Sequence, residues 1–172
     1  MPKKIESIRL DLEGEIDALF DDLESEELSK VDFESAMLGL LSAYIAAAFM
    51  AGAETEDVTP ETIAPLVEFQ AGYLAAFVTT MLAAEGINPA WRSRARSYAG
   101  AVVPAFWRGK NSGLVLPAYP GEGSECMQNC KCAWNIVRDA YGYDCYWELG
   151  YAEHCPTCVE RNREWYPWRI DL

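Results

Sequence analysis

The sequence predicts a mainly α-helical protein, in which a helical bundle is followed by a small cysteine-rich C-terminal mini-domain stapled by zinc. Three observations predict this fold. Apolar residues recur at helical spacing up to about residue 110, all six cysteines follow residue 125, and 51% of the 172 residues are hydrophobic, enough for a packed core. We therefore divide the chain into a helical domain at 1–113, a Pro/Gly linker at 114–125 and the mini-domain at 126–172.

The first predicted helix is amphipathic. Its apolar residues lie three and four positions apart, which places them on one face, and acidic residues fill most positions between them. The apolar face consists of Ile5, Ile8, Leu12, Ile16, Leu19 and Leu23. We expect the acidic face to be solvated, and the alternative is a docking surface for a basic partner.

The next two predicted helices are apolar on nearly every side. One runs from a cap at Asp32 or Ser35 to Ala53, and the other runs from a cap at Thr59 to Gly86. The most apolar run of the chain lies in the first of them, but it is rich in Ala and Gly and slightly short for a bilayer. Both helices are therefore predicted to form the centre of the bundle, and no membrane span is expected.

A fourth predicted helix carries the one basic segment of the chain. It begins at Asn88, and Pro104 should kink or divide it. No acidic residue occurs between residues 89 and 121. Its basic side chains either pair with the acidic first helix or contact a partner. The candidate partner-binding residues are Arg92, Arg96, Arg108 and Lys110.

Charge and the N-terminal sequence limit the function. The chain has 27 acidic and 14 basic residues, a formal net charge of −13. A surface that wraps nucleic acid needs clustered Lys and Arg, so any DNA contact is not expected to dominate binding. The first 15 residues lack the apolar run of a signal peptide. We therefore expect the protein to be made in a reducing cytoplasm, where cysteine thiols stay reduced.

The clustered cysteines predict a structural zinc site. A C-x2-C turn lets two thiolates converge on one ion, and a second cluster completes the tetrahedron. Nine of the 35 residues from Trp134 to Trp168 are Trp or Tyr and few are aliphatic. Burial of aliphatic side chains alone therefore cannot stabilise the mini-domain, and a bound metal ion is expected to do so. The expected ligands are Cys130, Cys132, Cys155 and Cys158, with Cys126 or His154 as substitutes.

Other uses of the cysteines stay open. Three disulfides, an iron–sulfur cluster, or a redox pair at Cys155 and Cys158 would each use these residues. Cys145 lies in an aromatic segment and is expected to be a buried thiol. No catalytic site is predicted, because His154 is the only histidine, the H-x-E partner of a deaminase-type C-x2-C is missing, and there is no Gly-rich phosphate loop.

Two segments of the C-terminal half, "NCKCAW" with Cys130 and Cys132 and "HCPTC" at residues 154–158, resemble elements of the head-morphogenesis (minor head protein) family of tailed bacteriophages. "NCKCAW", which contains Cys130, Cys132 and Trp134, is similar to an N-C-R-C-x-W element of that family. "HCPTC", at residues 154–158, is similar to an H-C-P-x-C element that ends near a Tyr-Pro, here at residues 166–167. The resemblance extends over residues 92–170.

The resemblance implies a non-enzymatic virion protein present in few copies. Such a protein binds the portal or the adjoining inner face of the capsid and assists head assembly or DNA passage. The expected partner is therefore the portal or the major capsid protein. Further copies of the chain are a second expected partner. Two alternatives stay open. One is a zinc-stabilised protein–protein adaptor of cellular origin, and the other is a thiol redox protein that uses Cys155 and Cys158.

Overall fold

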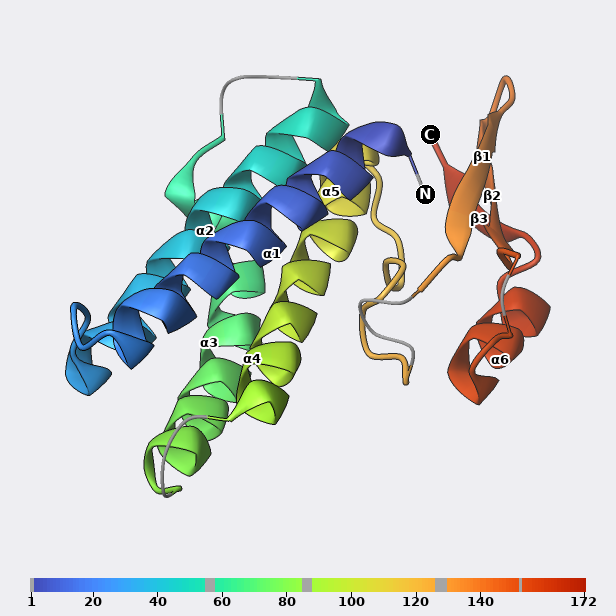
Figure 1. Ribbon diagram of the computed structural model, residues 1–172. Helices are drawn as coiled ribbons and strands as arrows, with labels where there is room; N and C mark the ends of the chain where they lie inside the picture. Colours follow the sequence, from blue (N-terminus) through green and yellow to red (C-terminus); the bar gives the residue numbers. More distant parts are fainter. Residues whose placement is uncertain (1, 55–57, 85–87, 126–129, 152) are drawn as a thin grey trace.

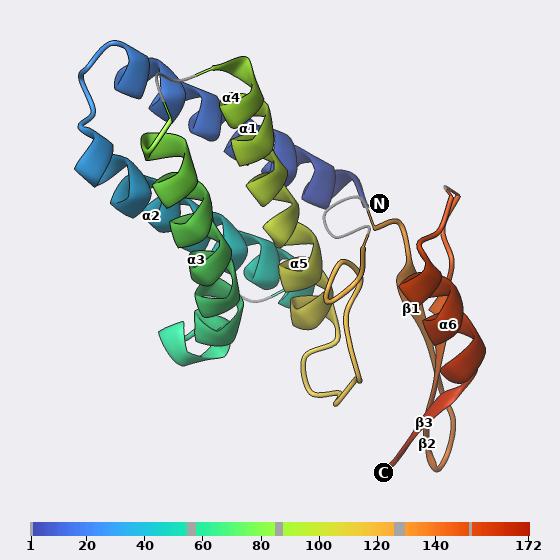
Figure 2. The same ribbon diagram turned by 90° about the horizontal axis from the view of Figure 1, so that it is seen from below.

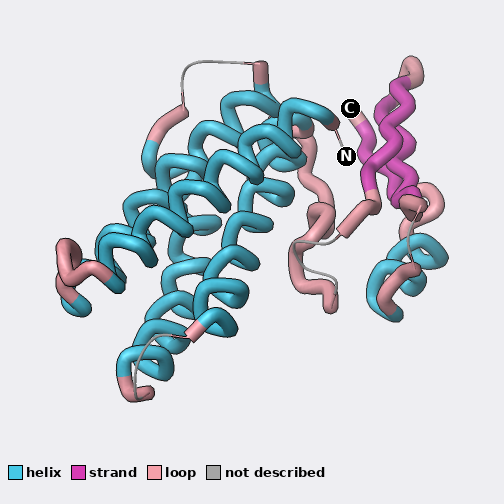
Figure 3. Tube along the Cα trace, in the orientation of Figure 1, coloured by secondary structure: helices cyan, strands magenta, loops and turns pink. Residues whose placement is uncertain are grey.

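The computed structural model describes residues 2–54, 58–84, 88–125, 130–151 and 153–172. Long helices form one body, and a small sheet with one short helix forms a second body near the N-terminus of the chain (Figure 1). Helices dominate the described residues, and the sheet is confined to the C-terminal part (Figure 3). The predicted fold class, mainly α with a small cysteine-rich C-terminal part, is confirmed.

Among the residues that the structure describes, the helical body contains five α-helices and one 3-10 segment. Their bounds are α1 (Lys3–Glu24), α2 (Lys30–Ala53), α3 (Pro60–Leu82), α4 (Pro89–Arg96), η1 (Ser97–Ala101) and α5 (Val102–Lys110). On α1 the predicted apolar face is buried, and Phe20, which the spacing argument omitted, is fully buried with it. Ile8 and Leu19 are partly buried and pack against the same core.

Short polar side chains cap the N-termini of two of these helices. The cap of α2 is Ser29, whose side chain accepts a hydrogen bond from the backbone N–H of Asp32, so the expected cap at Asp32 or Ser35 is wrong. Asp32 instead occupies the third helical position and accepts from the Ser29 hydroxyl, a reciprocal arrangement that stabilises the helix start. Asn88 caps α4 as predicted. The expected end of α3 at Gly86 lies outside the described residues, and α3 itself ends at Leu82.

Pro104 divides the fourth predicted helix, as expected. A proline lacks the N–H that would bond to the carbonyl four residues earlier, and its ring crowds that carbonyl. The turn before Pro104 is accordingly a 3-10 segment, Ser97–Ala101, with α4 on one side of it and α5 on the other. Figure 2 shows α4 and α5 as one continuous rod, with α3 beside it at the edge of the helical body.

The basic rod lies against the acidic helix α1. Arg92 contacts Asp21 at 2.6 Å and Glu24 at 3.2 Å, and Arg96 contacts Asp17 at 2.6 Å. Arg92 also lies over the Phe20 ring. Of the two interpretations of these charges, internal pairing is therefore the one that the structure shows for both arginines.

The segment at residues 114–125 contains no helix or strand but is well packed. Leu116, Ala118 and Tyr119 are buried, and the carbonyl of Ala118 accepts a 2.8 Å hydrogen bond from the indole of Trp134. Arg108 of α5 pairs with Glu122 in this segment and lies over the ring of Tyr119. The segment predicted as a linker thus connects the helical body to the C-terminal part by specific contacts.

The C-terminal part is a three-stranded antiparallel sheet with one helix. Its elements are β1 (Ala133–Arg138), β2 (Gly142–Glu148), α6 (Pro156–Glu164) and β3 (Trp168–Asp171), and the strand order is β1-β2-β3. In the β1–β2 register, Trp134 lies opposite Trp147 and Ile136 lies opposite Cys145. The sequence reasoning predicted no strands here, so the sheet is the main addition that the structure makes to the fold.

Candidate metal centre

Three cysteine sulfurs from distant parts of the sequence meet between the sheet and α6. Cys130 and Cys132 lie in the extended segment just before β1, and Cys158 lies in the first turn of α6. The three sulfurs all lie within 4.8 Å of one another, and those of Cys130 and Cys158 are 3.9 Å apart. All three side chains are buried, with exposed fractions of 3%, 3% and 0%. Three of the four expected ligands are therefore brought together.

The spacing of these sulfurs fits a tetrahedral thiolate site. Two sulfurs that are each about 2.3 Å from one zinc ion lie about 3.8 Å apart, close to the distance between Cys130 and Cys158. The hydrogen bond with Cys130, together with burial, holds the pKa of the Cys132 thiol far above its ordinary value. Several thiolates crowded in a buried site repel one another, and a divalent cation removes that repulsion. The three cysteines could therefore hold a metal ion.

Cys155 lies one helical turn before Cys158 but outside the three-sulfur group. It is the N-cap residue of α6 and is half-buried. Its thiol donates a hydrogen bond to the carboxylate of Glu125, and this bond, with those from the Glu125 backbone and Thr157, lowers the pKa of Glu125 to about 2. The N-terminus of a helix stabilises a thiolate, because its backbone N–H groups point outward and its dipole is positive there. Cys155 therefore stays the expected fourth ligand.

The sequence also offered Cys126 and His154 as alternative metal ligands. Cys126 lies outside the described residues, and the half-buried His154 is not part of the three-sulfur group. Cys145 is fully buried in the sheet, away from that group, as expected for a buried thiol, and burial raises its pKa. No disulfide joins any two of the five described cysteines.

An aromatic cluster supports the cysteines. Trp165 stacks on Trp134 at 5.7 Å between ring centroids, and Trp147 meets both rings edge-on. The Arg161 guanidinium lies over Trp147 and Trp165 and donates a 2.7 Å hydrogen bond to the carbonyl of Glu122. This cluster replaces the aliphatic core that the C-terminal part lacks, and it ties α6 to the segment before the cysteines.

Gly150 supports the site and was missed by the sequence reasoning. A Cβ at this position would lie 2.3 Å from the carbonyl oxygen of Lys131, the residue between Cys130 and Cys132. Only glycine allows the chain to pass so close to the segment that carries the two cysteines. Its place just after an aromatic strand was the available signal in the sequence.

The candidate partner-binding residues are engaged within the chain. Besides Arg92 and Arg96, which contact α1, Arg108 pairs with Glu122, and the Lys110 amine lies 5.0 Å from the centre of the Trp107 ring. Their binding of a partner stays a prediction.

The chain was also compared with models of protein families, with characterised proteins and with solved structures, and none of them matches it.

Proposed function

We propose that the protein is a non-enzymatic structural protein of a tailed-phage head, whose C-terminal part is stabilised by one zinc ion. The observation that carries the proposal is the meeting of the two segments that resemble the minor head family. The first segment supplies Cys130 and Cys132, and the second supplies Cys158, whose sulfur lies 3.9 Å from that of Cys130. Cysteines 26 and 28 positions apart in the sequence thus meet at one place, which favours a single module over two chance motifs.

Zinc is the proposed metal because of the donor set. Three or four cysteine thiolates in a closed, buried arrangement are typical of structural zinc sites. The ligands would be Cys130, Cys132 and Cys158 with Cys155, and the ion would link the segment before β1 to α6. Metal binding then contributes directly to the folding of a part that has little aliphatic core.

The burial of the cysteines also favours a structural role over thiol exchange. A redox cysteine must be reached by its partner and needs a lowered pKa. Cys158, the second residue of the C-x2-C pair, has no exposed surface, so a partner thiol cannot reach it.

The proposal predicts binding to a ring-shaped head protein. The full chain should cosediment with purified portal rings of the phage that encodes it, and mass spectrometry should detect it in purified particles. A Cys158→Ser variant should lose cosedimentation if the C-terminal part makes the contact. A chain that is absent from particles, and that neither portal rings nor the major capsid protein retain, would contradict the phage assignment without affecting the metal site.

A further inference from the structure

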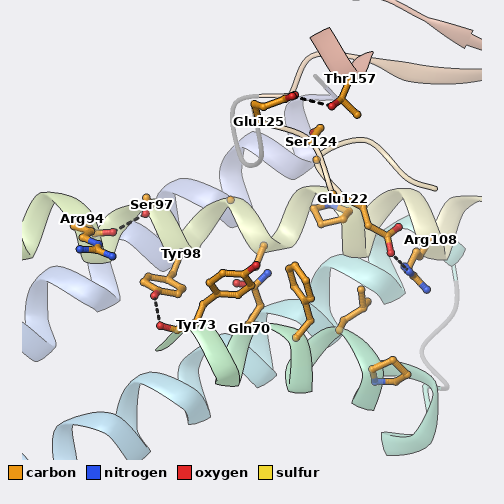
Figure 4. Close-up of a pocket in the computed structure, with 18 residues that line it drawn as sticks. Gln70, Tyr73, Arg94, Ser97, Tyr98, Arg108, Glu122, Ser124, Glu125 and Thr157 are labelled. Atoms are coloured by element: carbon orange, nitrogen blue, oxygen red, sulfur yellow. Dashed lines mark hydrogen bonds and ion pairs between the residues drawn. The ribbon is translucent and has the colours of Figure 1, made fainter. Parts of the chain in front are cut away.

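Glu122 contacts both parts of the molecule at once. Its carboxylate pairs with Arg108 of α5 and accepts a 3.1 Å hydrogen bond from the backbone N–H of Tyr119. Its backbone carbonyl accepts a 2.7 Å hydrogen bond from Arg161 of α6. The ion pair lies in the wall of a groove of about 740 Å³ that is lined by α3, the rod of α4 and α5, and residues 121–125 (Figure 4). We call the contacts of Glu122 with Arg108 and Arg161 the Glu122 bridge.

The contact of the bridge with the helical body is partly shielded from water. The side chains of Arg108 and Glu122 are each 33% exposed, and the guanidinium lies over the ring of Tyr119, 4.8 Å from its centre. Partial burial strengthens an ion pair, because the effective dielectric constant around it is lower than in bulk water. The position of residue 122 is therefore coupled to that of α5.

The contact of the bridge with the C-terminal part depends on how α6 is placed. Arg161 follows Cys158 by three residues, so the two side chains are neighbours on the surface of α6. The sulfur of Cys158 lies within 4.8 Å of those of Cys130 and Cys132, where the proposed ion would bind. An ion held there fixes the first turn of α6. It thereby fixes the position from which Arg161 reaches the carbonyl of Glu122.

Two further contacts join residues 114–125 to the elements that carry the cysteines. Thr157 of α6 donates a 2.9 Å hydrogen bond to the carboxylate of Glu125 (Figure 4). The indole of Trp134 in β1 donates a 2.8 Å hydrogen bond to the carbonyl of Ala118. Trp134, Thr157 and the arginine of the bridge each lie within three residues of a cysteine of the three-sulfur group. A change at the metal centre should therefore reach residues 114–125 at three points together.

We propose that metal binding controls how the C-terminal part docks on the helical body, and that the Glu122 bridge carries this coupling. With the ion bound, α6 and the segment before β1 hold residues 114–125 in place, and Glu122 keeps its pair with Arg108. Without the ion, α6 is no longer tied to that segment, and the contacts with residues 114–125 weaken together. The inference rests on the proposed metal site. It adds a regulatory role to that site, because the ion then also sets one wall of the groove.

Coupling of this kind acts in both directions. If the ion strengthens the pairing of Arg108 with Glu122, that pairing strengthens binding of the ion by the same factor. A substitution on α5, which carries none of the cysteines, should therefore lower the affinity for the metal. A metal ion that stabilises only the C-terminal part predicts no such effect.

The zinc affinity of the full chain, measured by competition with a coloured chelator at pH 7, tests the proposal. Arg108→Gln should weaken zinc binding about fivefold or more, a factor typical of coupled sites. Glu122→Gln should weaken it to a similar degree, because it removes the same ion pair and keeps the backbone carbonyl that Arg161 uses. The double variant should bind zinc no more weakly than either single variant, since each single change already removes the contact.

Arg94→Gln is the matched control for these variants. Arg94 belongs to the same rod and lines the same groove, but its guanidinium lies over the ring of Phe77 in α3. This variant should bind zinc like the wild type. Far-ultraviolet circular dichroism should show the same helix content in all variants, which separates a lost contact from a lost fold.

Hydrogen–deuterium exchange of the full chain gives a second readout. In the wild type, removal of zinc with a chelator should speed amide exchange in residues 114–125 severalfold. Exchange in α3 should stay unchanged, because α3 packs mainly against α2. In Arg108→Gln, exchange in residues 114–125 should be fast even with zinc bound, since one side of the Glu122 bridge is missing.

Three results would overturn the coupling and leave the metal site intact. The first is equal zinc affinity of the wild type, Arg108→Gln and Glu122→Gln. The second is a double variant whose loss of binding free energy is the sum of the two single losses. The third is exchange in residues 114–125 that removal of zinc leaves unchanged. Wild-type protein that binds no zinc would instead exclude the metal site itself, and the coupling with it.

Discussion

Gly52 of α2 and Gly109 of α5 lie at one crossing of the two helices, each against the backbone of the other helix. A Cβ on Gly52 would lie 2.0 Å from the carbonyl oxygen of Phe106, and a Cβ on Gly109 would lie 2.0 Å from that of Phe49. Helix α5 is short and follows a 3-10 segment, so its place against α2 depends on this close approach. The two glycines therefore position the rod that carries the arginines facing α1 and that leads into residues 114–125.

Replacing either crossing glycine with alanine should destabilise the protein. Gly109→Ala places a methyl group where backbone atoms already lie, and such overpacking costs about 1–3 kcal/mol of unfolding free energy. Urea unfolding followed by far-ultraviolet circular dichroism measures the loss. Gly39→Ala, also in α2, is the control. A Cβ there meets nothing within 4 Å, so stability should stay level or rise by about 0.5–1 kcal/mol. Equal effects at the two sites would contradict the close crossing.

Purified protein should contain about one zinc ion per chain, because one tetrahedral thiolate site takes one ion. Cys158→Ser should remove the metal and make residues 126–172 sensitive to protease, since metal binding here is folding free energy. Cys145→Ser should retain the metal, because Cys145 is buried in the sheet and lies outside the three-sulfur group. Elemental analysis and limited proteolysis measure both effects. Protein free of metal, with its cysteines paired as disulfides, would exclude the zinc site.

The fourth ligand can be identified separately. If Cys155 completes the site, Cys155→Ser should lower zinc affinity by orders of magnitude, whereas Cys126→Ser should leave it nearly unchanged. Competition with a coloured chelator at pH 7 gives both affinities. In cobalt-substituted protein, loss of one thiolate should also weaken the sulfur-to-metal charge-transfer absorption. The reverse order of the two variants would assign the fourth position to Cys126 and show that Cys155 serves Glu125 instead.

Much of the fold follows from the sequence because helix signals are local. The spacing of apolar residues on α1, the Asn88 cap and the break before Pro104 each depend on residues a few positions apart, and the structure confirms all three. The α2 cap was misplaced by three or more residues because Ser29, Asp32 and Ser35 all suit a cap. In the structure the start is fixed at Ser29 by its two hydrogen bonds with Asp32, one to the backbone N–H and one to the carboxylate.

The C-terminal sheet could not be derived in the same way. Its strands are short, and Trp134 and Trp147 pair across a hairpin whose stability depends on Trp165 and on α6, all distant in sequence. Alternation of large side chains in 133–138 and 142–148 was the available signal. The grouping of cysteines was predictable from spacing, whereas the separation of Cys155 from the other three sulfurs depends on the direction in which α6 begins.

One ion-pair cluster should make the sheet sensitive to acid. Arg169 of β3 contacts Asp139 at 2.7 Å and Asp144 at 3.0 Å, and it also contacts Asp171. The hydrogen bond from Arg169, with those from the backbone of Tyr141 and Gly142, lowers the pKa of Asp139 from 3.8 to about 2. A lowered carboxyl pKa contributes stability that is fully present above the unfolded value and is lost as pH falls through the folded value. The contribution should therefore be complete above about pH 5 and disappear toward pH 2.

Titration of Asp139 by nuclear magnetic resonance measures this directly. In the wild type its pKa should lie well below 3.8, and Arg169→Gln should raise it toward that value, because the strongest donor is removed. Arg138→Gln is the control. Arg138 neighbours Asp139 in sequence but lies over the ring of Tyr143, so its loss should move the pKa of Asp139 much less. Equal shifts in the two variants would mean that the general positive charge around the hairpin, and not the contact with Arg169, sets the pKa of Asp139.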